Sequence, residues 1–234
     1  MCGRFVSREQ AAIEREFDIR VRQPFERVYN AAPTMALPVV RVVPASPATE
    51  VAAAAPAERE AVAMRWGLVP GWWSKPTPPT STINARSEDA ASKPMWRAAV
   101  RCARALVPAL GWYEWRVTAD GKKQPYFIHA AGMAGCCFAG LWSARRDAQG
   151  AEQLSFAILT RAASRQLAAL HDRMPVVLPE ALFAEWLAPW PDAHAQRLAA
   201  CVTRARDEFE YHAVSRYVNA PRNQGERCIE PAAA

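Results

Sequence analysis

Residues 104–142 read RALVPALGWYEWRVTADGKKQPYFIHAAGMAGCCFAGLW, and this stretch decides the fold that we expect for the chain. It contains four runs of the apolar, β-branched and aromatic residues that are typical of strands, at 104–108, 112–118, 125–130 and 136–142. Asp120-Gly121 supplies turn residues between the second and third runs and predicts a hairpin there. Short strands that follow one another this closely indicate an antiparallel sheet.

The same pattern continues on both sides of this stretch. Further strand-like runs lie at 37–43, 62–69, 153–160 and 174–178. Helical patterns lie at 8–18, 86–99, 163–171 and 180–187, and Ser7-Arg8-Glu9-Gln10 gives the first of them the spacing of a capping box. These elements predict a single α+β domain, in which a curved, partly closed, barrel-like and mainly antiparallel sheet is flanked by peripheral helices. We expect the domain to span residues 1–220, with a surface excursion at 44–60 and a flexible tail at 221–234.

The composition is that of an ordinary soluble globular protein. Of the 234 residues, 51% are apolar and 22% are charged. No apolar run approaches the roughly 20 residues of a membrane span, and charged residues near the N-terminus interrupt any signal peptide. We therefore expect a cytoplasmic protein with no membrane partner, and nothing in the sequence indicates more than a monomer. The net charge of +6 favours a polyanionic partner.

The cysteines are scattered and do not form a metal-binding or disulfide pattern. There are six of them, and none has the C-x-x-C spacing: Cys2, Cys102, Cys136, Cys137, Cys201 and Cys228. No Gly-rich phosphate loop is present either. We therefore expect neither a metal nor a cofactor.

Cys2 is the residue with the most reactive potential. A small side chain in this position is the usual condition for removal of Met1, which would leave Cys2 with a free α-amine next to its thiol. The ordinary pKa values are ~7.7–8.0 for the amine and ~8.5 for the thiol, so both groups have a reactive fraction near neutral pH. Such a 1,2-aminothiol can attack an acyl carbon through sulfur, or condense with an aldehyde through nitrogen and then close a ring through sulfur. Position alone favours the alternative, an unremarkable residue at a frayed terminus, so the rest of the chain must decide.

Two further segments carry groups suited to nucleic acid. Trp72 and Trp73 follow a Pro-Gly turn, and neighbouring residues of an extended chain point in opposite directions, so one of them is expected to face a ligand or partner. Packing of both rings under a loop explains the pair about as well. Asn84 offers a donor and an acceptor, and Arg86 offers a planar fork suited to phosphate. Read alone, the Asn84–Arg86 segment is more typical of a capped helix entry than of a binding site.

Glu114 and His171 are the candidates for proton transfer. Glu114 lies among three aromatic residues in an expected strand, and burial there would raise the pKa of its carboxyl toward neutrality. An ion pair on a solvated face is the alternative. His171 precedes Arg173 at the end of a helical pattern; the imidazole can exchange protons near neutral pH, and Arg173 could bind a phosphate. A single histidine is nonetheless more often structural than catalytic.

These residues also fall within motifs of a known family. The sequence resembles the SOS response-associated peptidase (SRAP) family, which handles abasic sites in DNA. The resemblance rests on eight blocks in family order, which span almost the whole chain: Cys2-Gly3-Arg4-Phe5, Tyr29-Asn30-Ala31-Ala32-Pro33-Thr34, Arg65-Trp66-Gly67-Leu68-Val69-Pro70, Asn84-Ala85-Arg86-Ser87-Glu88, Gly111-Trp112-Tyr113-Glu114-Trp115, Ala139-Gly140-Leu141-Trp142, His171-Asp172-Arg173-Met174-Pro175 and Val214-Ser215-Arg216-Tyr217-Val218-Asn219.

The resemblance implies a covalent reaction with damaged DNA. Met1 would be removed, and the peptidase in the family name refers to removal by the protein itself. Cys2 would then condense with the open-ring aldehyde of an abasic site in single-stranded DNA and close to a thiazolidine, which links protein and DNA. Asn84 would position Cys2 or the sugar, Glu114 would shuttle protons, and His171 would act on the ring oxygen of the sugar.

The resemblance also implies how DNA is held. Arg4, Arg86 and Arg173 would bind phosphates, and Trp72 or Trp73 would stack on bases. In this interpretation the chain is an enzyme of DNA repair and of the SOS response, a hydrolase and protease toward Met1 and lyase-like toward abasic DNA.

Two alternatives from other classes remain at this point. A non-covalent reader of single-stranded or modified DNA would use the same tryptophans and arginines, and Cys2 would be incidental. An N-terminal-cysteine glutamine amidotransferase shares the Met-Cys-Gly start and attacks through the thiol. That class predicts a Gly-rich signature after Gly3, whereas Arg4 and Phe5 follow here, so it is the weaker alternative.

Overall fold

In the computed structural model, five strands close into a mixed β-barrel, and the described residues are 2–21, 23–43, 58–75, 78–147 and 149–232. The barrel strands are β2 (Ala36–Val42), β3 (Arg59–Trp66), β5 (Arg104–Val117), β7 (Cys136–Arg146) and β8 (Glu152–Ala162). They pair in the order β7-β8-β3-β2-β5, and the β5–β7 pairing closes the ring. All these pairings are antiparallel except β3–β8, which is parallel. The predicted single α+β domain with a mainly antiparallel, barrel-like sheet is therefore confirmed, and the barrel is closed.

Shorter strands extend the barrel at its edges. They are β1 (Phe5–Ser7), β4 (Asn84–Arg86), β6 (Lys123–His129), β9 (Arg173–Pro175), β10 (Val177–Leu178) and β11 (Glu210–Ala213). β1 and β6 pair with β5, whereas β4 and β9 pair with β8. The N-terminal segment is thereby attached to β5 through β1, and the segment that contains His171 is attached to β8 through β9.

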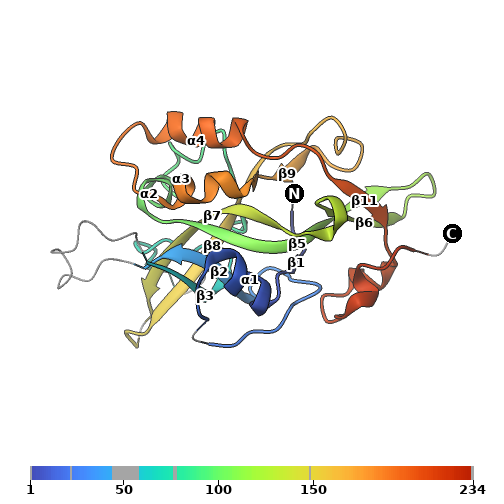
Figure 1. Cartoon of the computed structure of the whole chain (residues 1–234), viewed down its shortest axis with the longest axis horizontal. Coiled ribbons are helices and arrows are strands. Elements are labelled where there is room, and N and C mark those ends of the chain that lie inside the picture. Colours follow the sequence, from blue (N-terminus) through green and yellow to red (C-terminus); the bar gives the residue numbers. More distant parts are fainter. Residues whose placement is uncertain (1, 22, 44–57, 76–77, 148, 233–234) are drawn as a thin grey trace.

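The helices are short and lie outside the barrel. They are α1 (Gln10–Phe17), α2 (Arg97–Cys102), α3 (Phe183–Leu187) and α4 (His194–Thr203). Figure 1 shows α2, α3 and α4 together along one side of the barrel. α1 packs against the same group, since the Phe17 ring stacks on that of Phe183 with centroids 5.5 Å apart. None of the helices in the described residues is long and apolar enough to span a membrane.

The barrel strands are apolar on both faces because both faces are covered. Val39, Val107 and Ile158 belong to the cluster inside the barrel, whereas their neighbours Val40, Leu106 and Leu159 belong to the cluster beneath the helices. Side chains alternate between the faces of a strand, so two covered faces require a nearly continuous apolar run. This explains why eleven of the fourteen residues of β5, Arg104 to Glu114, are buried.

Aromatic side chains fill the barrel. The Trp66 ring lies 5.0 Å from that of Phe5 and 6.2 Å from that of Phe156, and its indole N–H donates to the Ile83 carbonyl at 2.9 Å. The interior of so small a barrel is a packed core and does not form a channel. Any functional site must therefore lie at its rim.

Several local predictions are confirmed, and others are wrong. The helices expected at 8–18 and 180–187 correspond to α1 and to a 3₁₀ turn at Glu180–Leu182 followed by α3. The runs at 104–108 and 112–118 form the single strand β5. No helix spans 86–99 or 163–171: hydrogen-bonded turns occupy residues 87–96 and 165–170, and only the short α2 follows the first. Most of the expected surface excursion lies outside the described residues, while Arg59 and Glu60 belong to β3.

The capping-box prediction is also wrong. Ser7 lies in β1, where its hydroxyl accepts a hydrogen bond from the Val28 amide at 2.8 Å, and Glu9 precedes the helix without a side-chain cap. Ser7 pairs with Ala109 of β5 as part of β1, so it cannot cap the helix as its local spacing predicted.

Residues 216–232, which include most of the predicted tail, contact the outer end of β5 and β6. Two 3₁₀ turns lie here, Arg216–Asn219 and Glu226–Cys228, and Val214 forms a bridge with Pro231. The Cys228 side chain is fully buried with Tyr113 and Phe127. The mobility of residues 221–234 stays a prediction.

Candidate functional site: a buried cysteine at the barrel rim

Strand β1 carries Cys2 to the barrel rim. Phe5 pairs with Trp112 of β5, and the Tyr113 amide donates to the Arg4 carbonyl at 3.0 Å. This pairing fixes the backbone just after Cys2, whose side chain is fully buried in the barrel cluster. Cys2 therefore lies in an ordered, enclosed position rather than at a frayed terminus.

Asn84 is bonded directly to Cys2. It opens β4, which pairs with β8 through Asn84 and Ile158. Its amide nitrogen Nδ2 donates to the Cys2 carbonyl at 2.7 Å. Its amide oxygen Oδ1 is buried and has no hydrogen-bond partner among the described residues. Since a buried acceptor without a partner is costly, Asn84 is placed to accept a hydrogen bond from a donor that joins the site.

Glu114 is a nearly buried carboxyl on the same side of the barrel. Its side chain is only 4% exposed, and burial raises the pKa of Glu114 to about 7, while the positive charge of the N-terminal amine acts in the opposite direction. A carboxyl with such a pKa is half protonated at neutral pH and can both donate and accept a proton.

Cys2 and Glu114 interact electrostatically. Burial raises the pKa of the Cys2 thiol well above its ordinary value, and the negative charge of Glu114 raises it further. The thiol is therefore protonated at neutral pH and needs a base before its sulfur can react as a thiolate. The neighbouring carboxylate is a group that could serve as that base.

His171 is linked to Glu114 through Asp172, which pairs with the imidazole and acts on the Glu114 carboxyl by its charge. Its ring nitrogen Nδ1 lies 2.9 Å from the Arg173 amide nitrogen and 2.7 Å from the Asp172 carboxylate. Nδ1 can accept from the amide when the imidazole is neutral or donate to Asp172 when it is protonated, but it cannot do both. Burial lowers the pKa of His171, with the charge of Asp172 acting against this effect, which favours the neutral ring. Asp172 also raises the pKa of Glu114. Sequence reasoning did not single out Asp172, although it lies in the His171 motif.

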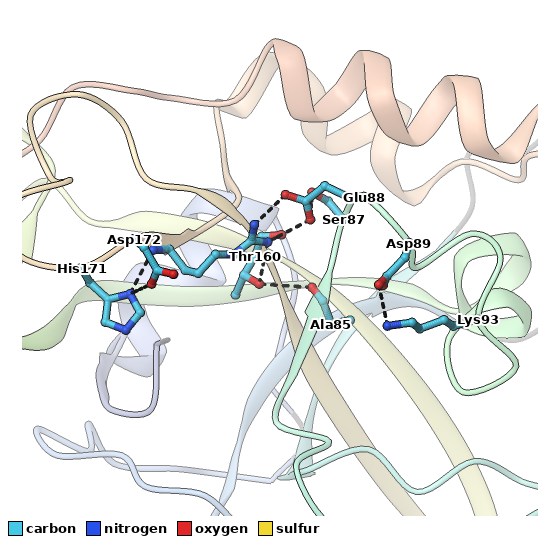
Figure 2. Close-up of polar contacts among 9 residues, drawn as sticks. Ala85, Ser87, Glu88, Asp89, Lys93, Thr160, His171 and Asp172 are labelled. Atoms are coloured by element: carbon cyan, nitrogen blue, oxygen red, sulfur yellow. Dashed lines mark hydrogen bonds and ion pairs between the residues drawn. The ribbon is translucent and has the colours of Figure 1, made fainter.

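Arg173 is held by contacts within the protein. Its guanidinium donates to both carboxylate oxygens of Glu88, at 2.6 and 2.9 Å, and to the Thr160 carbonyl at 2.8 Å. The Glu88 and Thr160 side chains appear on one side of this network in Figure 2, with His171 and Asp172 on the other. The Arg173 hydrogen bonds hold the pKa of Glu88 below its ordinary value. This pair links the segment after β4 to the His171 segment and fixes their relative positions.

Arg4 is also engaged within the protein. It donates to the Asn30 side-chain oxygen at 2.7 Å and to the Val218 and Asn219 carbonyls at 3.1 and 3.3 Å. Asn30 is fully buried, and its Nδ2 donates to the carbonyls of Val218, Ala220 and Asn223 at 2.9–3.1 Å. Asn30 therefore connects the segment after Cys2 to the C-terminal segment. Sequence reasoning assigned it no role, because its contacts are almost 200 residues away in the chain.

The remaining predicted DNA-binding residues are more accessible. The Trp72 side chain is 59% exposed, and its ring lies 5.8 Å from that of the half-buried Trp73. Lys75 lies 5.6 Å from the Trp73 ring. Arg86 is exposed on β4, two residues after Asn84. Trp72 and Arg86 thus present their side chains to solvent, as a role in binding requires.

Cys2 is not among the residues that line three surface cavities of the described chain. One of about 690 Å³ is bounded by α1, β3 and α3, one of about 510 Å³ by Ala131, Gln166 and residues 208–210, and one of about 480 Å³ by α1, the loop after β6 and Arg206. Cavity volume alone would therefore not locate the site. Within the described residues, no group of histidine, cysteine and acidic side chains is arranged to hold a metal ion.

The model of the SOS response associated peptidase family matches residues 1–221, and the chain belongs to this family. The family membership implied by the eight sequence blocks is confirmed.

Named relatives and solved structures agree with this assignment. The abasic site processing protein YedK of Escherichia coli is 38% identical over 167 residues, 71% of this chain and 72% of that protein. The abasic site processing protein HMCES of Gallus gallus is 32% identical over 200 residues, 74% of this chain and 58% of that protein. A crystal structure from Bacteroides thetaiotaomicron shares the fold, with a TM-score of 0.79, 18% identity and coverage of 98% of this chain and all of that one.

Proposed function

We propose that this protein processes abasic sites by trapping them covalently in single-stranded DNA through Cys2. The observation that carries the proposal is the pairing of a buried Cys2 thiol with the Glu114 carboxyl, whose pKa of about 7 suits proton transfer in both directions. The names of the relatives supply the substrate class, since YedK and HMCES are both named abasic site processing proteins.

The reaction proceeds in two bond-forming steps after hydrolysis has removed Met1. The freed Cys2 amine adds to the C1′ aldehyde of the open-ring sugar, and the resulting carbinolamine loses water to give an imine. The Cys2 sulfur then adds to the imine carbon, and the thiol proton passes to nitrogen. The product is a thiazolidine, and the overall change is loss of one water molecule.

Each site residue has a role in these steps. Glu114 protonates the departing hydroxyl of the carbinolamine, and as a carboxylate it then takes the proton of the thiol. Asn84 holds the Cys2 backbone, and its buried Oδ1 accepts a hydrogen bond from the Cys2 amine or a sugar hydroxyl. His171, with a lowered pKa, accepts the proton of the sugar C1′ hydroxyl as the ring opens and delivers it to the ring oxygen that departs, and it reverses this transfer when the ring closes again.

DNA binding relies on the cationic and aromatic groups around the rim. Arg86 and Trp72 contact a phosphate and a base directly. Arg4 and Arg173 already donate hydrogen bonds within the protein, so each binds a phosphate only through the N–H groups that these bonds leave over. The protein acts as a cytoplasmic monomer on single-stranded DNA, and it removes its own Met1. The same groups give lyase-like chemistry toward the abasic strand.

Covalency is the test of this proposal. The protein is incubated with an abasic single-stranded oligonucleotide and run on a denaturing gel. We expect a band shift that resists heat and SDS and that disappears in Cys2→Ala and in a variant in which an inserted bulky residue retains Met1. Equal binding of undamaged DNA without a covalent band would favour the non-covalent reader instead.

A further inference from the structure

A strip of side chains continues outward from Glu114 across the sheet. Glu114 of β5 pairs with Tyr126 of β6, Tyr126 pairs with Ala213 of β11, and Tyr211 pairs with Ile128. Paired residues, and residues two apart in a strand, lie on the same face of a sheet. Arg116, Tyr126 and Tyr211 therefore lie on the Glu114 face, and we call these three residues the tyrosine strip.

The rings and the cation of the tyrosine strip contact one another. The Tyr126 and Tyr211 rings meet edge to face, with centroids 6.0 Å apart and an angle of 72°. The Arg116 guanidinium lies 5.3 Å from the Tyr126 ring centre. Tyr126 also packs against the buried cluster that contains Cys2. The strip thus runs without interruption from the cysteine cluster to solvent, where Tyr211 is 39% exposed.

The opposite face of the same strands is occupied by the protein itself. There, Tyr113, Phe127 and Cys228 form a buried cluster with the C-terminal segment. The exposed acidic residue of β11, Glu210, pairs with His129 and belongs to that opposite face. Glu114 is therefore the one acidic residue on this face among the described positions of β5, β6 and β11, and outward from it the tyrosine strip presents aromatic and cationic groups.

We propose that the tyrosine strip is a subsite for a nucleotide next to the abasic site, with its base stacked on Tyr211 and its phosphate near Arg116. This inference rests on the proposed function, because the strand that is attacked at Cys2 must leave the site across a neighbouring face. Aromatic rings bind bases without sequence preference, since every base has a π-face, and arginine adds attraction to base and phosphate. The edge-to-face arrangement leaves Tyr211 exposed for a further ring.

The test separates base stacking from covalent trapping. Proteins carrying Cys2→Ala, which cannot form the crosslink, are titrated with fluorescent single-stranded oligonucleotides that contain a tetrahydrofuran analogue of the abasic site. One oligonucleotide has normal bases on both sides of the analogue, and a second has baseless tetrahydrofuran units there as well. Base–aromatic stacking is worth roughly 1–3 kcal/mol per base, so adding Tyr211→Ala should weaken binding about tenfold on the first oligonucleotide. It should change binding little on the second, and Tyr211→Trp should restore the affinity.

Val117→Ala provides the matched control. Val117 follows Arg116 in β5, so its side chain, which is 61% exposed, lies on the face opposite the tyrosine strip. Truncating this side chain should leave the affinities for both oligonucleotides unchanged. The proposal is wrong if Tyr211→Ala binds both oligonucleotides as tightly as its Cys2→Ala parent, or if it loses the same affinity on both. Absence of a gel-stable crosslink with the unmodified protein would overturn the proposed function instead, which makes the two failures distinguishable.

Discussion

Tyr113 and Glu114 are neighbours in β5, and both are buried, yet they belong to different regions of the molecule. Tyr113 points into the cluster beneath the C-terminal segment, where its hydroxyl donates to the Tyr29 carbonyl at 2.8 Å. Glu114 points to the opposite face and interacts with Cys2. Burial raises the pKa of both groups. The direction of a pKa shift therefore does not by itself identify a functional residue.

The difference lies in which protonation state each residue has at neutral pH. A phenol is neutral there already, so burial of Tyr113 only strengthens its ordinary state. A carboxyl is ionised there ordinarily, and burial of Glu114 brings both of its states into balance. The Glu114 face can thus exchange protons, whereas the Tyr113 face holds the C-terminal segment in place.

The largest effect is expected on the Glu114 face. Glu114→Gln keeps the shape of the side chain but removes the exchangeable proton, and general acid–base catalysis contributes ~10²–10⁴-fold to rates. Crosslink formation should slow by at least about 100-fold, while affinity for the abasic oligonucleotide changes little. Single-turnover gels and a binding titration measure the two quantities. A parallel loss of affinity would instead assign Glu114 to binding or folding.

The next effect concerns the contacts of the C-terminal segment. Asn30→Ala removes four hydrogen bonds, one from the Arg4 guanidinium and three to the carbonyls of Val218, Ala220 and Asn223. Each such bond is worth about 0.5–1.5 kcal/mol of net stability, so we expect a loss of about 3 kcal/mol in the free energy of unfolding. Urea denaturation measures this loss. Asn223→Ala is the matched control, since its partly buried side chain donates only to the Tyr217 carbonyl. A variant of Asn30 as stable as the unchanged protein would contradict the assignment.

A pH-dependent effect on stability follows from the raised pKa of Glu114. In the unfolded chain Glu114 loses its proton near its ordinary pKa of ~4.3, and in the folded protein near 7. Between these values the folded state holds more protons, so this residue lowers the stability of the protein as the pH rises through that window. Glu114→Gln should be more stable than the unchanged protein by about 3–4 kcal/mol above pH 7, and equally stable below about pH 4. Thermal unfolding across this range measures the difference, and a difference independent of pH would contradict the account.

The smallest effect is expected on the Tyr113 face. Tyr113→Phe removes one hydrogen bond to the Tyr29 carbonyl, which is worth about 1 kcal/mol of stability. The crosslinking rate should remain unchanged, because the Tyr113 ring faces away from Cys2. Denaturation and single-turnover gels measure the pair of outcomes. A fall in the rate as large as that of Glu114→Gln would remove the distinction between the two faces.

The sequence predicted the barrel because its strands carry their pattern locally. Residues 136–142 of β7 and 156–159 of β8 are apolar without a break, as strand segments covered on both faces must be. Wrong predictions occurred where pairing partners decide the conformation. Ser7 belongs to β1 because β5 offers a pairing edge, and residues 165–170 form turns although the spacing over 163–171 is helical. The short β4 and β11 have too few residues to show a pattern.

The candidate site was predictable to the extent that its chemistry resides in single residues. Cys2, Asn84, Glu114 and His171 were each identified from their own position or neighbours, and contacts and charge interactions connect them in the structure. The bonds of Arg4 to Asn30 and of Arg173 to Glu88 join segments far apart in the chain. Spacing along the chain carries no signal for contacts between distant segments. From the sequence alone, Arg4 and Arg173 were therefore predicted only to bind phosphates, and their internal partners were not predicted.

The intact mass of the protein, before and after exposure to an abasic single-stranded oligonucleotide, tests the central claim most directly. The account predicts that the starting protein lacks Met1, and that the adduct weighs the sum of protein and oligonucleotide less one water molecule. The Cys2→Ala protein should give no adduct. An adduct formed while Met1 is retained, or one that persists in Cys2→Ala, would contradict the claim that the Cys2 amine and thiol together trap the aldehyde.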